Sequence, residues 1–499
     1  MKSRIQPTII QIALHSLKTL RLPAASATPN RVERKGKSNV KLAPATTNQI
    51  LYSLMIPTVM MVLAGSMAGV ALPTIRTDFQ IPADMVAWVT TIYTLPFMIL
   101  MPLYGRLSDG LGKRRLILAG IIIFSIGSAI ILMAPSLAWL MAGRAIQGIG
   151  TAGLMPLGMA MISAIFPAAE RGKALGSWSA TGPMVGFLSP LAAGFLIDHW
   201  GWRAAFVPSL IMGFIAFIAI FKYVPAGLSQ VKPHFLRTFD WNGVILLVAA
   251  ATGFLFYLSS RPITGVASLR DWRLLAATIV LTGGFIWWER QRQNPFVNLQ
   301  IFKNRVFTLA SFSSGVRMFL MSGIGFLVPL YLVDVYQVSA AYVGGMMMIM
   351  PGTMILTVRF GGQIADKWGS RWPSVIGLAA QALGMAMFAW IPANASLWFA
   401  ALVLGFYGLG AGLVLAALHQ AAVANMSEEE VGPAAGLYSM IRFSGSAVGS
   451  ALGGVILQQY LSRSLTPIEA YQIVFLCFAG AALLGVAAAF GLYGAKAKN

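Results

Sequence analysis

Long apolar stretches alternate with short polar segments along almost the whole chain after residue 48. Most of these stretches reach about 18 residues, the length that an α-helix needs to cross the hydrocarbon core of a bilayer. The pattern therefore predicts fourteen membrane-spanning helices. Their approximate limits are 49–73, 86–107, 115–135, 137–165, 171–197, 202–224, 241–259, 273–288, 306–333, 341–362, 372–391, 396–424, 434–460 and 468–495.

One polar connection between these stretches occurs twice, 257 positions apart. The residues that define the two copies are Gly105, Asp109, Gly112, Lys113 and Arg114 in the first, and Gly362, Asp366 and Gly369 in the second. A repeated loop that joins two helices in each half indicates two homologous helical bundles, a plan used by secondary transporters. Glycines allow close approach of the backbone, and an aspartate can face the positive N-terminus of a neighbouring helix. We therefore expect this loop to act as a gate that is locked in one conformation and released in the other.

The expected fold is an all-α integral membrane protein with two pseudo-symmetric six-helix bundles and two extra helices. The predicted boundaries are a basic tail at 1–48, a first bundle at 49–224, an insertion of two helices at 225–305 and a second bundle at 306–499. Within the tail, apolar residues beside a polar stripe suit a short helix lying on the membrane surface.

Composition supports a bilayer protein. The chain is 57% hydrophobic and 10% charged, with a mean hydropathy of +0.74, whereas a soluble chain carries about 25% charged residues. The net charge of +21 lies in short loops rather than on one solvated face, so nucleic-acid binding is not expected. A single cysteine, Cys477, excludes an intrachain disulfide.

Charge also predicts the orientation. With both termini placed inside, the inner segments hold 26 of the 36 Lys and Arg residues and the outer loops hold six. Basic loops stay on the cytoplasmic side of a membrane. We therefore expect a multi-pass protein of the cell membrane with both termini in the cytoplasm and an even number of spans.

Four arginines fall within apolar runs: Arg144, Arg317, Arg359 and Arg442. A charge at the bilayer centre costs about 2.5–3.5 kcal/mol, so such residues face the bundle interior or a wet cavity. Binding to backbone carbonyls is the alternative role. None of the fifteen acidic residues falls in the middle of a span, although a buried carboxylate is the usual proton carrier. His419 lies near an inner helix end, where a capping or surface role is expected.

Further motifs carry a family resemblance. The fourth run contains Arg144, Gln147 and Gly148, and the fifth contains Gly182, Pro183, Gly186, Pro190 and Gly194. With the two loops, these motifs resemble the major facilitator superfamily and, within it, the fourteen-helix drug:proton antiporter branch. The likeness covers residues 49–495. It implies alternating-access export of hydrophobic small molecules by proton antiport, with the fourth-helix motif involved in coupling.

The chain also departs from that pattern. Members usually have an acidic residue in the first helix where Ala64 stands, so a proton site is missing. Gly110 replaces a base in the loop, and Ser189 and Ala193 replace glycines of the fifth helix. The remaining small residues and prolines of that helix suit close packing and bending.

Two intramembrane arginines without carboxylates favour an anionic or neutral substrate over a cation. The expected substrate cavity is formed by Tyr93, Trp178, Arg317, Tyr438 and Arg442. A uniporter, a carrier coupled to another ion and a membrane sensor without transport stay open as alternatives. One cysteine and four scattered histidines argue against an enzyme. We expect no cofactor and no metal. The expected partners are a small-molecule substrate, protons and membrane lipids, and we expect a monomer.

Overall fold

A computed structural model describes residues 44–225, 239–292, 295–392, 395–424, 426, 428–463 and 465–492. The side chains of 44–46, 109, 168, 169, 428–430 and 432 are not described. The surface helix expected within residues 1–48 falls almost entirely outside these ranges. The described residues belong to one compact unit, Leu42–Asn499.

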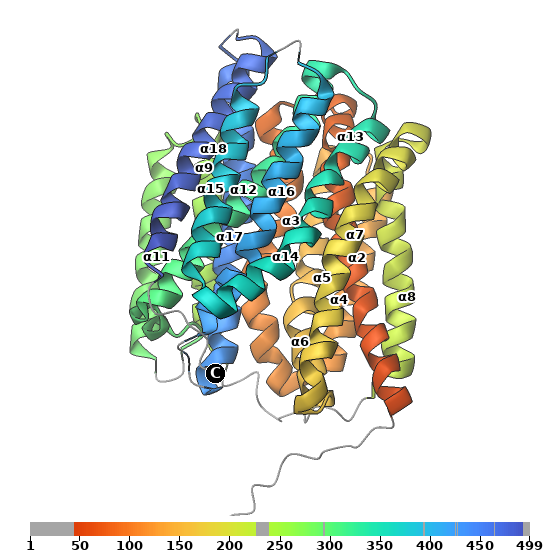
Figure 1. The fold of residues 1–499 in the computed structure, drawn as a ribbon, viewed down its shortest axis with the longest axis vertical. Helices are drawn as coiled ribbons and strands as arrows, with labels where there is room; N and C mark the ends of the chain where they lie inside the picture. Colours follow the sequence, from red (N-terminus) through yellow and green to blue (C-terminus); the bar gives the residue numbers. More distant parts are fainter. Residues whose placement is uncertain are drawn as a thin grey trace, which may run out of the picture. The chain divides into compact units, whose positions relative to one another are not determined.

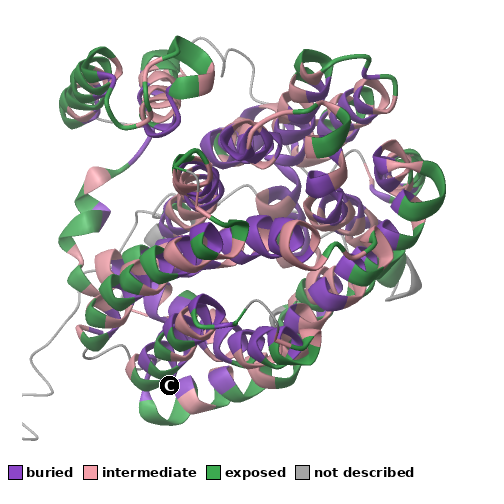
Figure 2. Cartoon of the chain, turned by 90° about the horizontal axis from the view of Figure 1, so that it is seen from above, coloured by how far each residue is buried: buried purple, intermediate pink, exposed green. Residues whose placement is uncertain are grey.

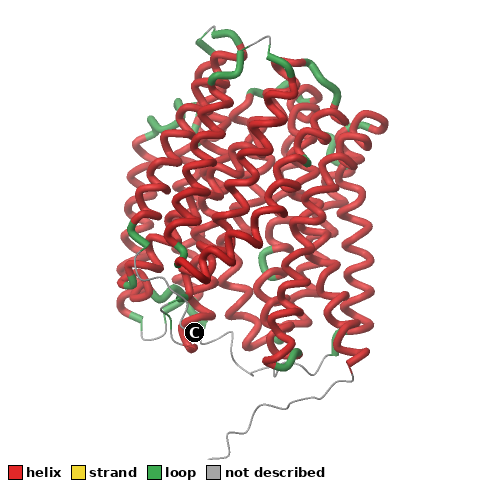
Figure 3. Tube along the Cα trace, in the orientation of Figure 1, coloured by secondary structure: helices red, strands yellow, loops and turns green. Residues whose placement is uncertain are grey.

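Helices account for nearly all of the described residues (Figures 1 and 3). The first half contains α2 (Pro44–Asp78), α3 (Ala83–Leu111), α4 (Lys113–Leu132), α5 (Leu137–Thr151), α6 (Leu154–Ile165), α7 (Ala168–Trp200), η1 (Trp202–Phe206) and α8 (Val207–Tyr223). Next come α9 (Trp241–Leu258), α10 (Arg261–Thr264), α11 (Trp272–Gln291) and η4 (Leu299–Lys303). The second half contains α12 (Arg305–Tyr336), α13 (Ala340–Met347), α14 (Ile349–Trp368), α15 (Arg371–Ala389), α16 (Leu397–Val423), α17 (Glu428–Leu461) and α18 (Pro467–Phe490).

Thirteen helical segments of the described chain are long and apolar enough to cross a membrane. They correspond to thirteen of the fourteen expected spans. The other expected span, 273–288, lies in α11, which has 20 residues and is therefore about 30 Å long. Its sequence contains Arg273, Glu289 and Arg290, which lower its hydropathy. The described part of each of the fourteen expected spans is thus mainly helical.

The two halves repeat the same helix pairings. In the first half α2 packs on α7 and α8, α5 packs on α3 and α4, and α4 packs on α8. In the second half α12 packs on α17 and α18, α16 packs on α14 and α15, and α15 packs on α18. Because the helices correspond in order, the pairings are those of one bundle used twice. The halves meet where α3 packs on α17 and where α7 packs on α13 and α14.

The inserted helices α9 and α11 pack on each other at one edge of the bundle (Figure 1). Of the two, α9 contacts both α3 and α17, so the insertion lies over the seam between the halves. Trp88 Nε1 donates to Ser259 Oγ at 3.0 Å, and Arg261 lies 3.8 Å from Asp84. The pair is thereby attached to α3.

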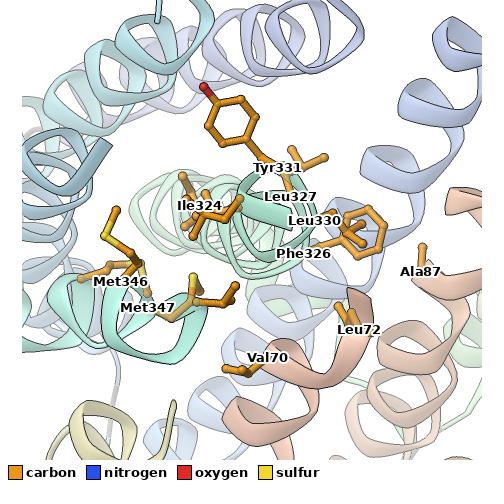
Figure 4. Close-up of a cluster of buried hydrophobic side chains, with 14 of the residues drawn as sticks. Val70, Leu72, Ala87, Ile324, Phe326, Leu327, Leu330, Tyr331, Met346 and Met347 are labelled. Carbon is orange, nitrogen blue, oxygen red and sulfur yellow. The ribbon is translucent and has the colours of Figure 1, made fainter. Parts of the chain in front are cut away.

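The largest buried cluster lies between the halves. It contains Val70 and Leu72 of α2, Ala87 of α3, Ile324 to Tyr331 of α12, and Met346 and Met347 of α13 (Figure 4). Seen along the helices, buried positions face inward and exposed ones face outward (Figure 2). Since the outward positions are largely apolar, the periphery suits lipid rather than water.

Exposed tryptophans lie near the helix ends, as in the aromatic belts of membrane proteins. They are Trp139, Trp200, Trp241, Trp272, Trp287, Trp368, Trp372, Trp390 and Trp398. This distribution is consistent with helices whose ends reach the two membrane–water interfaces.

Candidate functional site

The two repeated loops adopt the same backbone conformation. Gly112, between α3 and α4, has φ +88°, and Gly369, at the end of α14, has φ +84°. Side chains rarely tolerate this region, so glycine is needed at both turns. We call the end of the bundle that holds these turns the Gly112 end, and the opposite end, where α2 finishes, the Asp78 end.

Contacts of the loop residues join neighbouring helices at the Gly112 end. Arg114 donates to the carbonyl of Phe221 at 2.7 Å, which connects α4 to α8. In the second copy, Gln420 of α16 donates to Asp366 at 2.6 Å. The side chain of Asp109 is not described, so its expected gating contact stays a prediction.

Arg144 lies inside the first half and is 1% exposed. Its Nε donates to the Val89 carbonyl at 3.0 Å, and its Nη1 donates to the Ala64 carbonyl at 3.2 Å and to Gln147 Oε1 at 2.9 Å. The guanidinium carbon lies 4.4 Å from the centre of the Tyr93 ring. Backbone carbonyls and an aromatic face thus stabilise this charge without a carboxylate.

Two of the other expected residues support the same region. A Cβ added to Gly148 would lie 2.2 Å from the Tyr93 carbonyl oxygen, so glycine permits the close packing of α5 on α3. Trp178 is 3% exposed and donates its ring N–H to the Leu54 carbonyl at 3.2 Å. The close packing at Gly148 thus keeps Tyr93 beside Arg144, and the hydrogen bond of Trp178 joins α7 to α2.

The fifth-helix motif lies along two surfaces of α7. Gly182 and Gly186 face Val62 of α2 at 3.9 Å from the position that a Cβ would take. A Cβ on Gly194 would lie 2.2 Å from the Ala340 carbonyl oxygen, so it would clash with α13. Pro183 and Pro190 lie inside α7. This motif therefore provides a close backbone contact between the two halves.

Polar contacts also join the halves at the Asp78 end. The Arg76 guanidinium lies 2.6 Å from Asp334, which also accepts from the Tyr471 hydroxyl at 2.7 Å. Asp198 of α7 accepts from the backbone N–H groups of Ala340 and Ala341, both at 2.9 Å. These contacts close the bundle at the Asp78 end.

The second half contains a different arginine cluster, formed by α12, α16 and α17. Arg317 is 2% exposed, and its Nε and Nη2 donate to the Ala411 carbonyl at 3.3 and 3.2 Å. Arg442 is only partly buried, and its Nη1 lies 3.3 Å from His419 Nε2. The His419 ring also contacts the ring of Tyr438 edge to face, at 5.1 Å.

Arg442 has unused hydrogen-bonding capacity, as several other buried polar groups of the described residues do. Arg442 Nε is buried and has no hydrogen-bond partner among the described residues. The four ion pairs found in the described part of the chain are Arg76–Asp334, Arg203–Asp78, Arg261–Asp84 and Arg273–Asp271. Arg442 and Arg317 therefore have no carboxylate partner there, and a donor with no acceptor suits an anionic or polar ligand group.

His419 was not predicted to belong to this cluster. Its Nδ1 lies 2.7 Å from the Leu415 carbonyl, which fits a ring with the proton on Nδ1 and a free acceptor at Nε2. Its ring is exposed and faces Arg442 on a different helix. Only the packing of α16 on α17 brings the two together, and the sequence does not encode that contact in any local pattern.

A second unpredicted cluster lies at the Gly112 end, outside the bundles. Asp240 precedes α9, and Glu289 lies in the last turn of α11, beyond the expected span 273–288. Glu289 is 3% exposed. Burial is the main cause that raises the pKa of Glu289 to about 7; the hydrogen bond from Val297 opposes this shift, and the Asp240 carboxylate adds to it.

Where side chains are described, no three His, Cys, Asp or Glu residues lie close enough together to hold a metal ion.

The comparisons with known proteins agree with this architecture. The family model for the Major Facilitator Superfamily matches residues 54–450 and 310–499. Multidrug resistance protein Stp of Mycobacterium tuberculosis (strain CDC 1551 / Oshkosh) is 30% identical over 412 residues, which cover 82% of this chain and 75% of that protein. Riboflavin transporter RibZ of Clostridioides difficile (strain 630) is 28% identical over 421 residues, covering 84% and 89%.

Solved structures share the fold. A crystal structure of the peptide transporter POT in complex with sulfate has a TM-score of 0.67 at 14% identity, covering 89% of this chain and 94% of that one. A bacterial homolog of the human lysosomal transporter Spinster, inward-facing and unoccupied, has a TM-score of 0.64 at 16% identity, covering 90% and 98%.

Two bundles that repeat the same helix pairings, together with the family match and the relatives, identify a multi-pass membrane transporter rather than an enzyme. The chain belongs to the Major Facilitator Superfamily. Its relatives named as multidrug resistance proteins place it in the multidrug efflux branch, as a multi-pass protein of the cell membrane that carries small molecules.

Proposed function

We propose that this transporter exports hydrophobic small molecules that are anionic or neutral, in exchange for protons. The observation that carries the substrate class is Arg442, whose buried Nε has no hydrogen-bond partner among the described residues and whose Nη1 contacts His419. A cationic drug would be repelled at this position, whereas a carboxylate, phenolate or carbonyl oxygen would satisfy the free donor.

The contacts at the Asp78 end support a cytoplasm-open conformation. With both termini in the cytoplasm, the Gly112 end faces inward, and the end closed by Arg76, Asp334 and Asp198 faces outward. His419 lies in the last part of α16, which ends at Val423. Its neighbour Gln420 donates to Asp366, a residue of the repeated loop at the Gly112 end. A substrate would therefore reach Arg442 from the cytoplasm, as export requires.

Transport in liposomes tests the substrate class. Arg442→Gln keeps a polar side chain but removes the charge, so we expect uptake of an anionic hydrophobic compound to fall at least about tenfold, while a neutral analogue changes less than about twofold. Arg359→Gln is the matched control, because Arg359 also lies within an apolar helix but is exposed on α14. Equal losses for both compounds would contradict an anion-binding role.

A uniporter is the second candidate, and Ala64 favours it. This residue is 1% exposed and stands where a carboxylate would be expected, so the first half lacks that proton carrier. A pH reporter inside the liposomes separates the two functions. Substrate-dependent proton movement supports antiport, and substrate movement without it supports a uniporter.

A further inference from the structure

The contact between the inserted helices α9 and α11 contains two carboxyl groups that face each other. Asp240 Oδ1 accepts from the Gly243 N–H at 3.1 Å and from the Trp288 ring N–H at 2.9 Å. Glu289 Oε2 accepts from the Val297 N–H at 3.1 Å. The other oxygens, Asp240 Oδ2 and Glu289 Oε1, are both buried and have no hydrogen-bond partner among the described residues.

Gly243 shows how near these two oxygens are to each other. A Cβ built on this glycine would lie 2.6 Å from Glu289 Oε1 and 2.7 Å from Asp240 Oδ2. Both free oxygens therefore border the same small space. Two buried carboxylates there would repel each other, whereas one proton would convert both unpartnered acceptors into a single O–H···O bond.

The arginines around the two carboxyl groups do not neutralise them in place of a proton. Arg106 of α3 acts on Glu289 electrostatically but donates its own Nη1 to the Pro295 carbonyl, at 2.7 Å. Arg290 and Arg292 are exposed, and the Arg292 guanidinium lies over the Trp288 ring at 4.3 Å. None of these arginines forms an ion pair with Asp240 or Glu289 in the described part of the chain.

We propose that Asp240 and Glu289 form a binding site for one exchangeable proton, and that occupancy of this site controls the contact between the inserted helices and the end of α3. In the occupied state, Glu289 Oε1–H donates to Asp240 Oδ2. On release the proton passes from Glu289 to water, Glu289 becomes a carboxylate like Asp240, and the two carboxylates repel each other across Gly243. This inference deepens the proposed proton coupling.

A chain of two hydrogen bonds connects the site to α3. Glu289 accepts a hydrogen bond from the Val297 N–H. Two residues before Val297, the Pro295 carbonyl accepts a hydrogen bond from Arg106 of α3. Arg106 directly follows Gly105, the first residue of the repeated loop. Movement of the last turn of α11 would therefore displace the acceptor of Arg106. The site thus connects a proton to the segment expected to gate the transporter.

The direction of the pH effect follows from the pKa of Glu289, which is raised to about 7. Below that pH the pair holds its proton and the insertion stays joined to α3, and above it the contact loosens. Infrared difference spectroscopy on the full-length protein tests this directly. We expect the carbonyl stretch of a protonated carboxyl that titrates near pH 7, and its loss in Glu289→Gln.

Gly243→Ala provides a second variant, which keeps both carboxyl groups but places a methyl group between them. Because this methyl group cannot fit beside both free oxygens, the two carboxyl groups must move relative to each other, and we expect the midpoint of the carboxyl titration to differ from that of the wild type. Asp271→Asn is the matched control, since Asp271 caps the opposite end of the same helix and Asn can replace that cap. We expect the control to keep the wild-type titration.

An unchanged carboxyl band in Glu289→Gln, or wild-type titration in Gly243→Ala, would overturn the inference. Transport gives a separate readout. We expect the wild-type rate to change with pH around the same midpoint, and that dependence to disappear in Glu289→Gln. If anion transport persists in the wild type with no carboxyl titration, the proton site is disproved while the proposed function survives.

Discussion

The two halves of the bundle share one set of helix pairings but surround their buried arginines differently. In the first half, Nε and Nη1 of Arg144 donate to backbone carbonyls and to Gln147, and the side chain is 1% exposed. In the second half, Arg442 is partly exposed, and its Nε has no hydrogen-bond partner in the part of the chain that the structure describes. A satisfied polar network makes the fold rigid, whereas an unsatisfied donor can bind a ligand.

This difference assigns separate roles to the halves. The Arg144 network joins α5 to α2 and α3, so it fixes the geometry of the first bundle. The cluster of Arg442, His419 and Tyr438 lies between α16 and α17, and under the proposed function it is where the substrate binds. Pseudo-symmetry of the backbone therefore does not extend to the chemistry.

The largest expected effect is on stability. Arg144→Ala leaves the carbonyls of Val89 and Ala64 and the Gln147 side chain without their donor, and we expect it to lower the free energy of unfolding by about 3–5 kcal/mol. Arg442→Ala should cost less than about 1 kcal/mol, because its exposed side has access to water. Thermal unfolding in detergent measures both.

Similar losses in the two variants would contradict the distinction between a structural and a ligand-binding arginine. Arg144→Lys tests whether the structural role depends on the shape of the guanidinium as well as on its charge. A single ammonium cannot reproduce the planar fork that reaches Val89 and Ala64 together, so this variant should recover only part of the stability.

Much of the fold could be predicted from the sequence, because apolar length and the position of basic loops report directly on the bilayer. The site could be predicted only in part. Arg317 and Arg442 are detectable as charges in apolar runs, but His419 joins Arg442 through the packing of α16 on α17. Tyr93 is predicted to line the cavity with Arg442, and its contact with the Arg144 guanidinium at 4.4 Å is one that the sequence does not indicate. Sequence spacing does not reveal such contacts between helices.

His419 provides a test of intermediate size. Its Nε2 lies 3.3 Å from Arg442 Nη1 and orients the guanidinium, so His419→Ala should raise the KM for an anionic substrate about three- to tenfold and leave kcat nearly unchanged. Initial rates over a range of substrate concentrations separate the two constants. If kcat falls and KM stays constant, His419 acts in the conformational or coupling step rather than by positioning Arg442.

The smallest expected effect comes from supplying the first half with a carboxylate. Ala64→Asp places an acid on the residue whose carbonyl already accepts from Arg144, so attraction to the guanidinium should offset most of the cost of burial, and the free energy of unfolding should change by about 1 kcal/mol or less. Ala71→Asp is the matched control, because Ala71 is 0% exposed on the same helix and lies within the apolar cluster between the halves. An unpaired carboxyl there should cost several kcal/mol or become protonated. Thermal unfolding separates the two variants, and equal losses would mean that the Arg144 network has no capacity for a charged partner. If Ala64→Asp is tolerated, the hydrogen-bond network around Arg144 can accept the acidic residue that this chain lacks. The difference in surroundings between Arg144 and Arg442 would then depend on the side chain at position 64 rather than on the backbone.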